Sequence, residues 1–144
     1  MVEKDTIRLL RECDAGVKMG ISSIDDVIAS VSSEELKTLL INCRSEHAKL
    51  ECELDELLKD YHDEGKDPNL MAKGMSWVKT NVMLAMDGSD ATIADLMTDG
   101  CDMGVKSLSK YLNQYAAADE VSKDIAKRLI KIEADLAVNM RGFL

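Results

Sequence analysis

The sequence predicts an all-α fold, a four-helix bundle built from two αα-hairpins within a single domain, 1–144. Three observations lead to this prediction. The chain contains one proline, Pro68, and its long proline-free stretches are rich in residues that favour helix. Apolar residues recur at helical spacing in four long segments. No segment alternates between apolar and polar residues over the length of a strand, so no sheet is expected.

The first hairpin is predicted over residues 5–64. Its first helix, 5–30, carries an apolar stripe with Asp14 in the middle, and Asp5 is placed to cap its start. The stripe of the second helix comprises Leu36, Leu40, Cys43, His47, Leu50, Leu54, Leu57 and Tyr61. Because only two or three residues connect the helices, they are expected to pack antiparallel.

Helix boundaries are marked by capping residues. Ser32 with Glu35 three residues later forms a capping box for the second helix, and Gly65 is its expected stop. The second hairpin is predicted over 91–143. Its helices, 91–116 and 120–142, are expected to be capped by Ser89 or Asp90 and by Asp119 respectively.

A shorter helix, 68–87, is predicted in the connection between the hairpins, beginning at Asp67-Pro68. It is rich in methionine, with Met71, Met75, Met83 and Met86 near Trp77. Such a stripe is either buried against the bundle, exposed to a partner, or a face for self-association that would make a homo-oligomer.

An internal repeat supports the two-hairpin arrangement. The hexapeptide CDAGVK at 13–18 recurs as CDMGVK at 101–106, and the stripes of the helices that follow align, Leu36 with Ile125 and Leu40 with Leu129. Two duplicated hairpins joined by one long crossover have the topology of ferritin-like bundles.

The segment MSWVKTNVMLAMDGSDATIADLMTDGCDMGVKSL, 75–108, resembles bacterial ferritin-like domains of unknown function. The shared features are a tryptophan in the short helix, a Gly-containing turn and an acidic start of the next helix; LLRECDAGVKMG, 9–20, is similar to the first helix of those domains. The resemblance covers nearly the whole chain. It implies a ferritin-like bundle and no particular activity.

Composition excludes several classes of partner. The net charge of −9 and an aromatic content of 3% argue against nucleic acid and against an anionic membrane surface. No secretory signal is visible, and no apolar run approaches the ~18 residues of a membrane helix. The four cysteines show no CxxC spacing. We therefore expect a cytoplasmic protein with free thiols.

Carboxylates at related positions suggest a metal site in the bundle. The predicted ligands for iron, manganese or zinc are Asp14, Glu46, His47, Asp102 and Asp135, with Glu133 as a further candidate. The set lacks the Glu-x-x-His pattern of di-metal bundles, and the repeat mate of His47 is Leu136. The simpler interpretation is that these are polar residues flanking the core, with Asp14–Lys18 and Asp102–Lys106 as helical ion pairs.

A second candidate set consists of sulfur and imidazole ligands that suit Zn²⁺ or Cu(I): Cys13, Cys43, His47 and Cys101. The simpler interpretation is that the thiols are buried as small apolar side chains. Neither a phosphate-binding loop nor a catalytic triad is visible. Two functions are therefore predicted: a non-catalytic structural or association module without a complete di-metal site, or a metal-binding protein.

Overall fold

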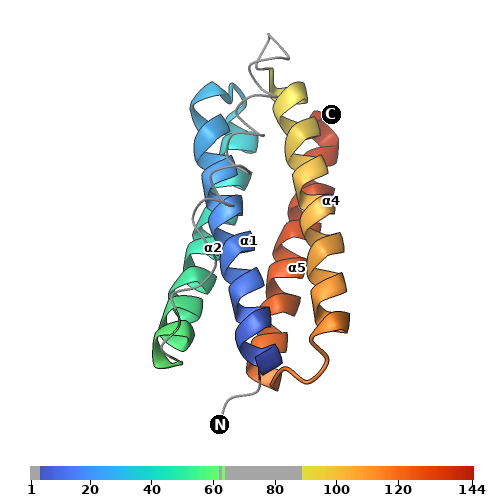
Figure 1. Ribbon diagram of the computed structural model, residues 1–144. Helices are drawn as coiled ribbons and strands as arrows, with labels where there is room; N and C mark the ends of the chain where they lie inside the picture. Colours follow the sequence, from blue (N-terminus) through green and yellow to red (C-terminus); the bar gives the residue numbers. More distant parts are fainter. Residues whose placement is uncertain (1–3, 62, 64–88) are drawn as a thin grey trace.

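Four long helices make up the computed structural model, which describes residues 4–61, 63 and 89–144 (Figure 1). They are α1 (Lys4–Val27), α2 (Glu34–Asp60), α4 (Asp90–Gln114) and α5 (Glu120–Met140), with 3-10 turns at Ile28–Ser30 and Arg141–Phe143. No strand occurs in these ranges, which confirms the all-α prediction. The predicted short helix 68–87 lies outside the described residues. None of the four helices is long and apolar enough to cross a membrane.

The helices form a bundle in which α1 packs against α2 and α4 packs against α5. Figure 1 shows α1 running from the N-terminal end of the bundle to the other end, α2 and α4 running back, and α5 running parallel to α1. Contacts of α2 with α5, and of α1 with both α4 and α5, join the two pairs. The first helix ends at Val27 rather than at the predicted residue 30, because its last turn tightens to a 3-10 turn.

Side chains cap three of the helices. The Ser89 hydroxyl accepts from the Thr92 N–H at 3.2 Å, and an Asp119 carboxylate oxygen accepts from the Ser122 N–H. Both caps were predicted from the sequence. The cap of α2 is Ser33, not the predicted Ser32, because Ser33 presents its hydroxyl to the helix N–H groups while the backbone of Ser32 turns toward α4.

The two short interhelix loops, between α1 and α2 and between α4 and α5, are each held by the first turn of a helix from the other pair. The Asp90 carboxylate in α4 accepts from the N–H groups of Ser32 and Ser33 at 2.8 and 2.9 Å. The Asp5 carboxylate in α1 accepts from the Ala117 N–H at 3.2 Å and so holds a distant loop. Because α1 already includes Lys4, Asp5 lies inside the first turn and is not the predicted cap of its helix. Beside it, the Thr6 hydroxyl accepts from the Asp119 N–H at 2.9 Å. We call these two sets of bonds the loop ties.

The apolar core consists of two clusters, one toward each end of the bundle. The first contains Leu9, Leu10, Cys13, Val17, Leu50, Leu54, Leu58, Leu108, Ala118, Ile125, Ala126 and Leu129. The second contains Ile24, Val27, Leu36, Leu40, Cys43, Ile93, Ala94, Met97, Cys101, Leu136 and Met140. Most members fall on the predicted stripes, although α2 buries Leu58 where the stripe predicted Leu57.

Between the clusters, each helix contributes one residue that belongs to neither. These residues are Gly20 in α1, His47 in α2, Gly104 in α4 and Glu133 in α5. We call them the central layer. Each lies three or four positions from the nearest core residues of its own helix, which is the spacing of side chains that share one helix face. At this level of the bundle, α2 and α5 therefore contribute polar side chains, whereas α1 and α4 contribute glycines.

Candidate functional site

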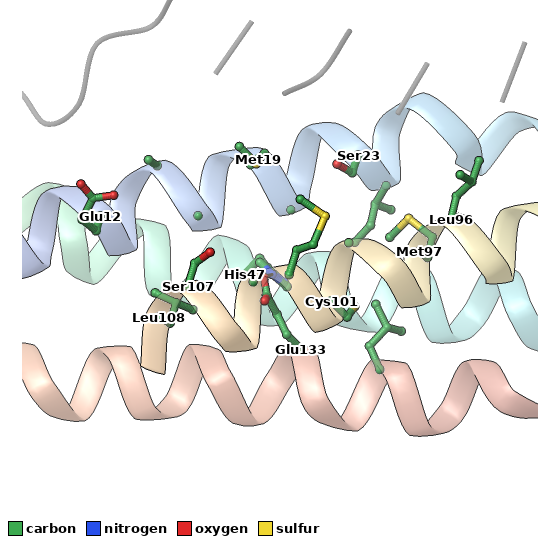
Figure 2. A pocket seen from close by; sticks show the side chains of 18 of the residues that line it. Glu12, Met19, Ser23, His47, Leu96, Met97, Cys101, Ser107, Leu108 and Glu133 are labelled. Atoms are coloured by element: carbon green, nitrogen blue, oxygen red, sulfur yellow. Dashed lines mark ion pairs between the residues drawn. The ribbon is translucent and has the colours of Figure 1, made fainter. Parts of the chain in front are cut away.

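A pocket of about 350 Å³ lies at the level of the central layer, bordered mainly by α1 and α4 (Figure 2). This volume is within the range of small-molecule binding sites. Most of its wall is apolar: Met19, Ile24, Leu96, Met97, Met103 and Leu108. His47 and Glu133 also line it, and they reach it from α2 and α5. The pocket therefore combines apolar walls with a polar floor.

The two glycines of the central layer make room for the polar floor. A Cβ atom at position 20 would lie 2.6 Å from His47 Nε2, and a Cβ atom at position 104 would lie 1.9 Å from Glu133 Oε2. Both distances are too short for any larger residue to fit without displacing its neighbour. His47 and Glu133 thus occupy the space that side chains on α1 and α4 would otherwise fill.

His47 and Glu133 face each other across the floor of the pocket. His47 is 2% exposed and Glu133 is 8% exposed. His47 Nδ1–H donates to the carbonyl oxygen of Cys43 at 2.8 Å, one turn earlier in α2, which fixes the proton on Nδ1. The other ring nitrogen, Nε2, lies 3.8 Å from Glu133 Oε1, too far for a direct hydrogen bond.

Two polar atoms of this pair are buried without a hydrogen-bond partner in the described structure: His47 Nε2 and Glu133 Oε2. An unsatisfied buried polar group costs about 1–3 kcal/mol of stability. Such groups are uncommon in native proteins and call for an explanation. The pair is therefore an energetically costly feature of the bundle interior, as is Asp14, whose buried Oδ1 also lacks a partner in the described residues.

The pair retains one proton at neutral pH. Burial alone lowers the pKa of His47, but hydrogen bonding with Cys43 and the attraction of the nearby Glu133 carboxylate outweigh burial and raise this pKa to about 10. Burial also raises the pKa of Glu133, and the adjacent imidazole only partly opposes that rise. Both shifts favour a state in which the pair holds one proton more than a neutral imidazole and a carboxylate would hold. The net charge of the pair is then zero.

The thiols near the site are held in their protonated form. Burial raises the pKa of Cys101, which lines the pocket, and nearby Glu133 and Cys43 add to the rise. Burial raises the pKa of Cys13 to about 12, with smaller effects from Glu12 and Asp14. Because the thiolate is both the nucleophile and the metal ligand, these cysteines are poor nucleophiles and poor metal ligands near neutral pH.

The structure separates the five predicted metal ligands. His47 is on the pocket floor, whereas Asp14 is buried outside the pocket lining and accepts a hydrogen bond from Lys18 at 2.9 Å. Burial raises the pKa of Asp14, and Lys18 acts in the opposite direction. The other three, Glu46, Asp102 and Asp135, are exposed.

These carboxylates do not converge, because helix geometry directs them elsewhere. Glu46 immediately precedes His47 and points about 100° away from it around α2. Asp135 instead pairs with Lys131 at 2.8 Å on the surface of α5. Among the described residues, no group of three or more His, Cys, Asp or Glu side chains is arranged to hold a metal ion, and this includes the sulfur and imidazole set.

The glycines of the central layer were not identified from the sequence, although a signal was present. Gly20 and Gly104 lie inside long helices, where glycine costs about 1 kcal/mol relative to alanine, and both fall at core spacing. Glu133 likewise lies between Leu129 and Leu136 at core spacing, but the sequence indicated it only as a further candidate metal ligand. Only the structure shows that each glycine faces a polar side chain.

No model of a protein family, no curated protein and no solved structure matches this chain.

Proposed function

We propose that this chain is a ferritin-like four-helix bundle that acts as a non-catalytic binding module and holds a small, mainly apolar molecule in its central pocket. One observation carries the proposal: the pocket is floored by two buried polar side chains whose outer atoms lack partners. A bundle with only a structural role would be as stable, or more stable, with apolar residues in their place. A bound molecule with a hydrogen-bonding group would supply a partner to His47 Nε2.

A binding role fits the chemistry of the floor better than catalysis does. A general base that works at neutral pH needs a pKa near 7, and the pKa of His47 is about 10. The pocket thiol, Cys101, is kept protonated by burial and so is a poor nucleophile. The pair can hold and orient a polar group, but it is a weak source or acceptor of protons near pH 7.

The ferritin-like assignment rests on chain topology and on the repeat. Helices α1 and α5 run in one direction, and α2 and α4 run in the opposite direction (Figure 1). The long connection in the sequence joins α2 to α4. This order is that of bundles with one crossover. The repeated hexapeptides place Cys13 and Cys101 at buried positions in α1 and α4.

Two earlier expectations do not enter this proposal. The methionine-rich helix 68–87, predicted as a face for homo-oligomers, lies outside the described residues. The metal-binding alternative has His47 alone of its five carboxylate and imidazole ligands at the pocket. Elemental analysis of protein purified without chelator or added metal tests this alternative. Iron, manganese or zinc at one or more equivalents per chain would support it.

The test of the proposed function is the binding of an uncharged apolar dye, N-phenyl-1-naphthylamine. We expect saturable fluorescence enhancement with about one dye molecule per chain. Gly100 lines the pocket, and a Cβ atom there would meet nothing within 4 Å, so we expect Gly100→Phe to occupy the pocket and abolish binding.

Gly142→Phe is the matched control. A Cβ atom at position 142 also has open space around it, but this residue lies outside the pocket lining. We expect it to bind the dye like the wild type. Absence of saturable binding to the wild type, or equal binding to Gly100→Phe, would show that the pocket is not a binding site.

A further inference from the structure

We infer that the pocket selects an uncharged molecule with a hydroxyl group, an alcohol or a phenol, and that this hydroxyl bridges His47 and Glu133. The inference rests on the proposed function and adds the chemical class of the ligand. It follows from three features of the site: the spacing of the polar pair, the charges that face the pocket, and the apolar walls.

The spacing of the pair suits one bridging oxygen. His47 Nε2 and Glu133 Oε1 are 3.8 Å apart, so they do not bond directly, yet one oxygen atom can lie within about 2.8 Å of both. Nε2 of the imidazolium donates and the carboxylate accepts, so the bridging group must accept one hydrogen bond and donate another. A hydroxyl does both from a single atom. An ether or a ketone can only accept.

The charges around the pocket disfavour an ionised ligand. The titratable groups of its described lining are two carboxylates, one imidazole, one thiol and one phenol, and there is no Lys or Arg: Glu12, Glu133, His47, Cys101 and Tyr111. A carboxylate or phosphate would therefore lack a free counter-charge. An ammonium group would have to compete with the imidazole of His47 for Glu133, and the other carboxylate of the lining, Glu12, already takes part in an interaction. The side chains of Cys43 and Cys101, which lie beside the pair, cannot provide a positive charge.

The walls suit the apolar body of such a molecule. Met19, Met97 and Met103 line the pocket, and thioether sulfur makes favourable contacts with aromatic rings. Met19 and Met103 are also among the exposed large apolar residues, at 39% and 60%. These two side chains place flexible apolar surface at the pocket on α1 and α4, which favours a phenol or another hydroxylated ring system.

Three naphthalene derivatives that differ only in the polar substituent test the inference. They are 2-naphthol, which donates and accepts; 2-methoxynaphthalene, which only accepts; and 2-naphthoate, an anion. At pH 7 we expect the wild type to bind 2-naphthol about tenfold or more tightly than either of the others, because the ether leaves the carboxylate unsatisfied and the anion lacks a counter-charge.

The double variant His47→Leu/Glu133→Leu is the matched control for these three ligands. It keeps the apolar walls and removes the polar floor, so 2-naphthol and 2-methoxynaphthalene should bind to it within about twofold of each other. Calorimetry of the wild type in buffers with different ionisation enthalpies gives a second measurement that does not depend on the variant. A neutral hydroxyl should bind without net uptake or release of protons.

The outcomes distinguish the two proposals. If no naphthalene derivative binds, the proposed function fails and the inference fails with it. If all three bind the wild type with similar affinity, the pocket is a binding site but the hydroxyl bridge is wrong. Tighter binding of 2-naphthoate, accompanied by proton uptake, would also overturn the bridge and show that the pair recognises an acid.

Discussion

At the scale of single residues, His47 and Glu133 depend on each other. Each lies in a position that its helix otherwise fills with apolar side chains, and each has the other as its nearest charge partner in the interior. Removing one member of such a pair leaves a buried charge or dipole without compensation, whereas removing both leaves a larger apolar core. The difference between those two changes measures how strongly the residues are coupled.

We predict that His47→Leu lowers the free energy of unfolding by about 3–5 kcal/mol, because Glu133 is then buried alone. His47→Leu/Glu133→Leu should return it to within about 1 kcal/mol of the wild type or above it. Urea denaturation followed by far-ultraviolet circular dichroism measures both. Glu46→Gln, at the exposed neighbouring position, is the control and should change the value by less than about 0.5 kcal/mol. Equal losses in the single and double variants would contradict the coupling.

The pair should also make stability depend on pH. The pKa of His47 rises from an ordinary 6.5 to about 10 in the folded protein, so the folded state retains a proton that the unfolded state loses. The resulting stabilisation is complete below about pH 6.5 and is lost as the pH rises toward 10. Between these values the free energy of unfolding should fall by up to about 1.4 kcal/mol per pH unit.

The double variant lacking the pair isolates this effect. Cys13 and Cys101 contribute slopes of the same sign in both proteins, since burial raises the pKa of Cys13 from 9.0 to about 12 and also raises the pKa of Cys101. Measurements between pH 6.5 and 8.5 therefore report mainly on the pair. A wild type and double variant with parallel pH profiles would show that the pair does not hold the extra proton.

At the scale of a helix, α4 contains two glycines four residues apart with opposite surroundings. A Cβ atom at position 104 would lie 1.9 Å from Glu133 Oε2, whereas one at position 100 would meet nothing within 4 Å. Both lie inside the helix, where alanine is intrinsically favoured by about 1 kcal/mol. The contrast therefore separates the cost of a steric clash from the gain in helix propensity.

We predict that Gly104→Ala lowers the free energy of unfolding by about 1–3 kcal/mol, as expected for overpacking, while Gly100→Ala raises it by about 0.5–1 kcal/mol. Thermal and urea unfolding of the two variants test the difference. In a Glu133→Ala background the clash is absent, so Gly104→Ala should then become stabilising. A stabilising Gly104→Ala in the otherwise wild-type chain would show that the carboxylate is not packed against α4.

The sequence was most informative at this scale. Periodicity predicted the four long helices of the described chain to within a few residues, and Ser89 and Asp119 cap their helices as expected. Two predicted caps, Ser32 and Asp5, were wrong, and each of these residues binds a distant segment of the chain. Asp5 was expected to cap α1, and instead it binds the loop before α5.

At the scale of the whole molecule, the central layer explains why the candidate site was only partly predictable. Periodicity identifies which residues face inward on one helix, so it singled out His47 as an inward-facing polar residue. It does not show which inward positions on separate helices share one level. The pocket depends on glycines in α1 and α4 standing opposite long polar side chains from α2 and α5, and this arrangement exists only after the helices have packed.

The loop ties are the other feature of the whole molecule with a measurable effect. We predict that Asp90→Ala lowers the free energy of unfolding by about 1–3 kcal/mol, because the Ser32 and Ser33 N–H groups lose a charged acceptor. Asp95→Ala, at an exposed position on the same helix, is the control and should change it by less than about 0.5 kcal/mol. Urea denaturation provides both values, and similar values for the two variants would contradict the role of the tie.

The loop ties also bear on cooperativity. Because Asp90 binds the α1–α2 loop and Asp5 binds the α4–α5 loop, neither helix pair can satisfy its own turn without the other. A partly unfolded state that kept one pair intact would expose backbone donors of that pair to water, although its helices were still formed. The Ser33 and Ala117 amide hydrogens should therefore exchange with solvent only when the two helix pairs separate. Their protection from hydrogen exchange then measures the association of α1–α2 with α4–α5.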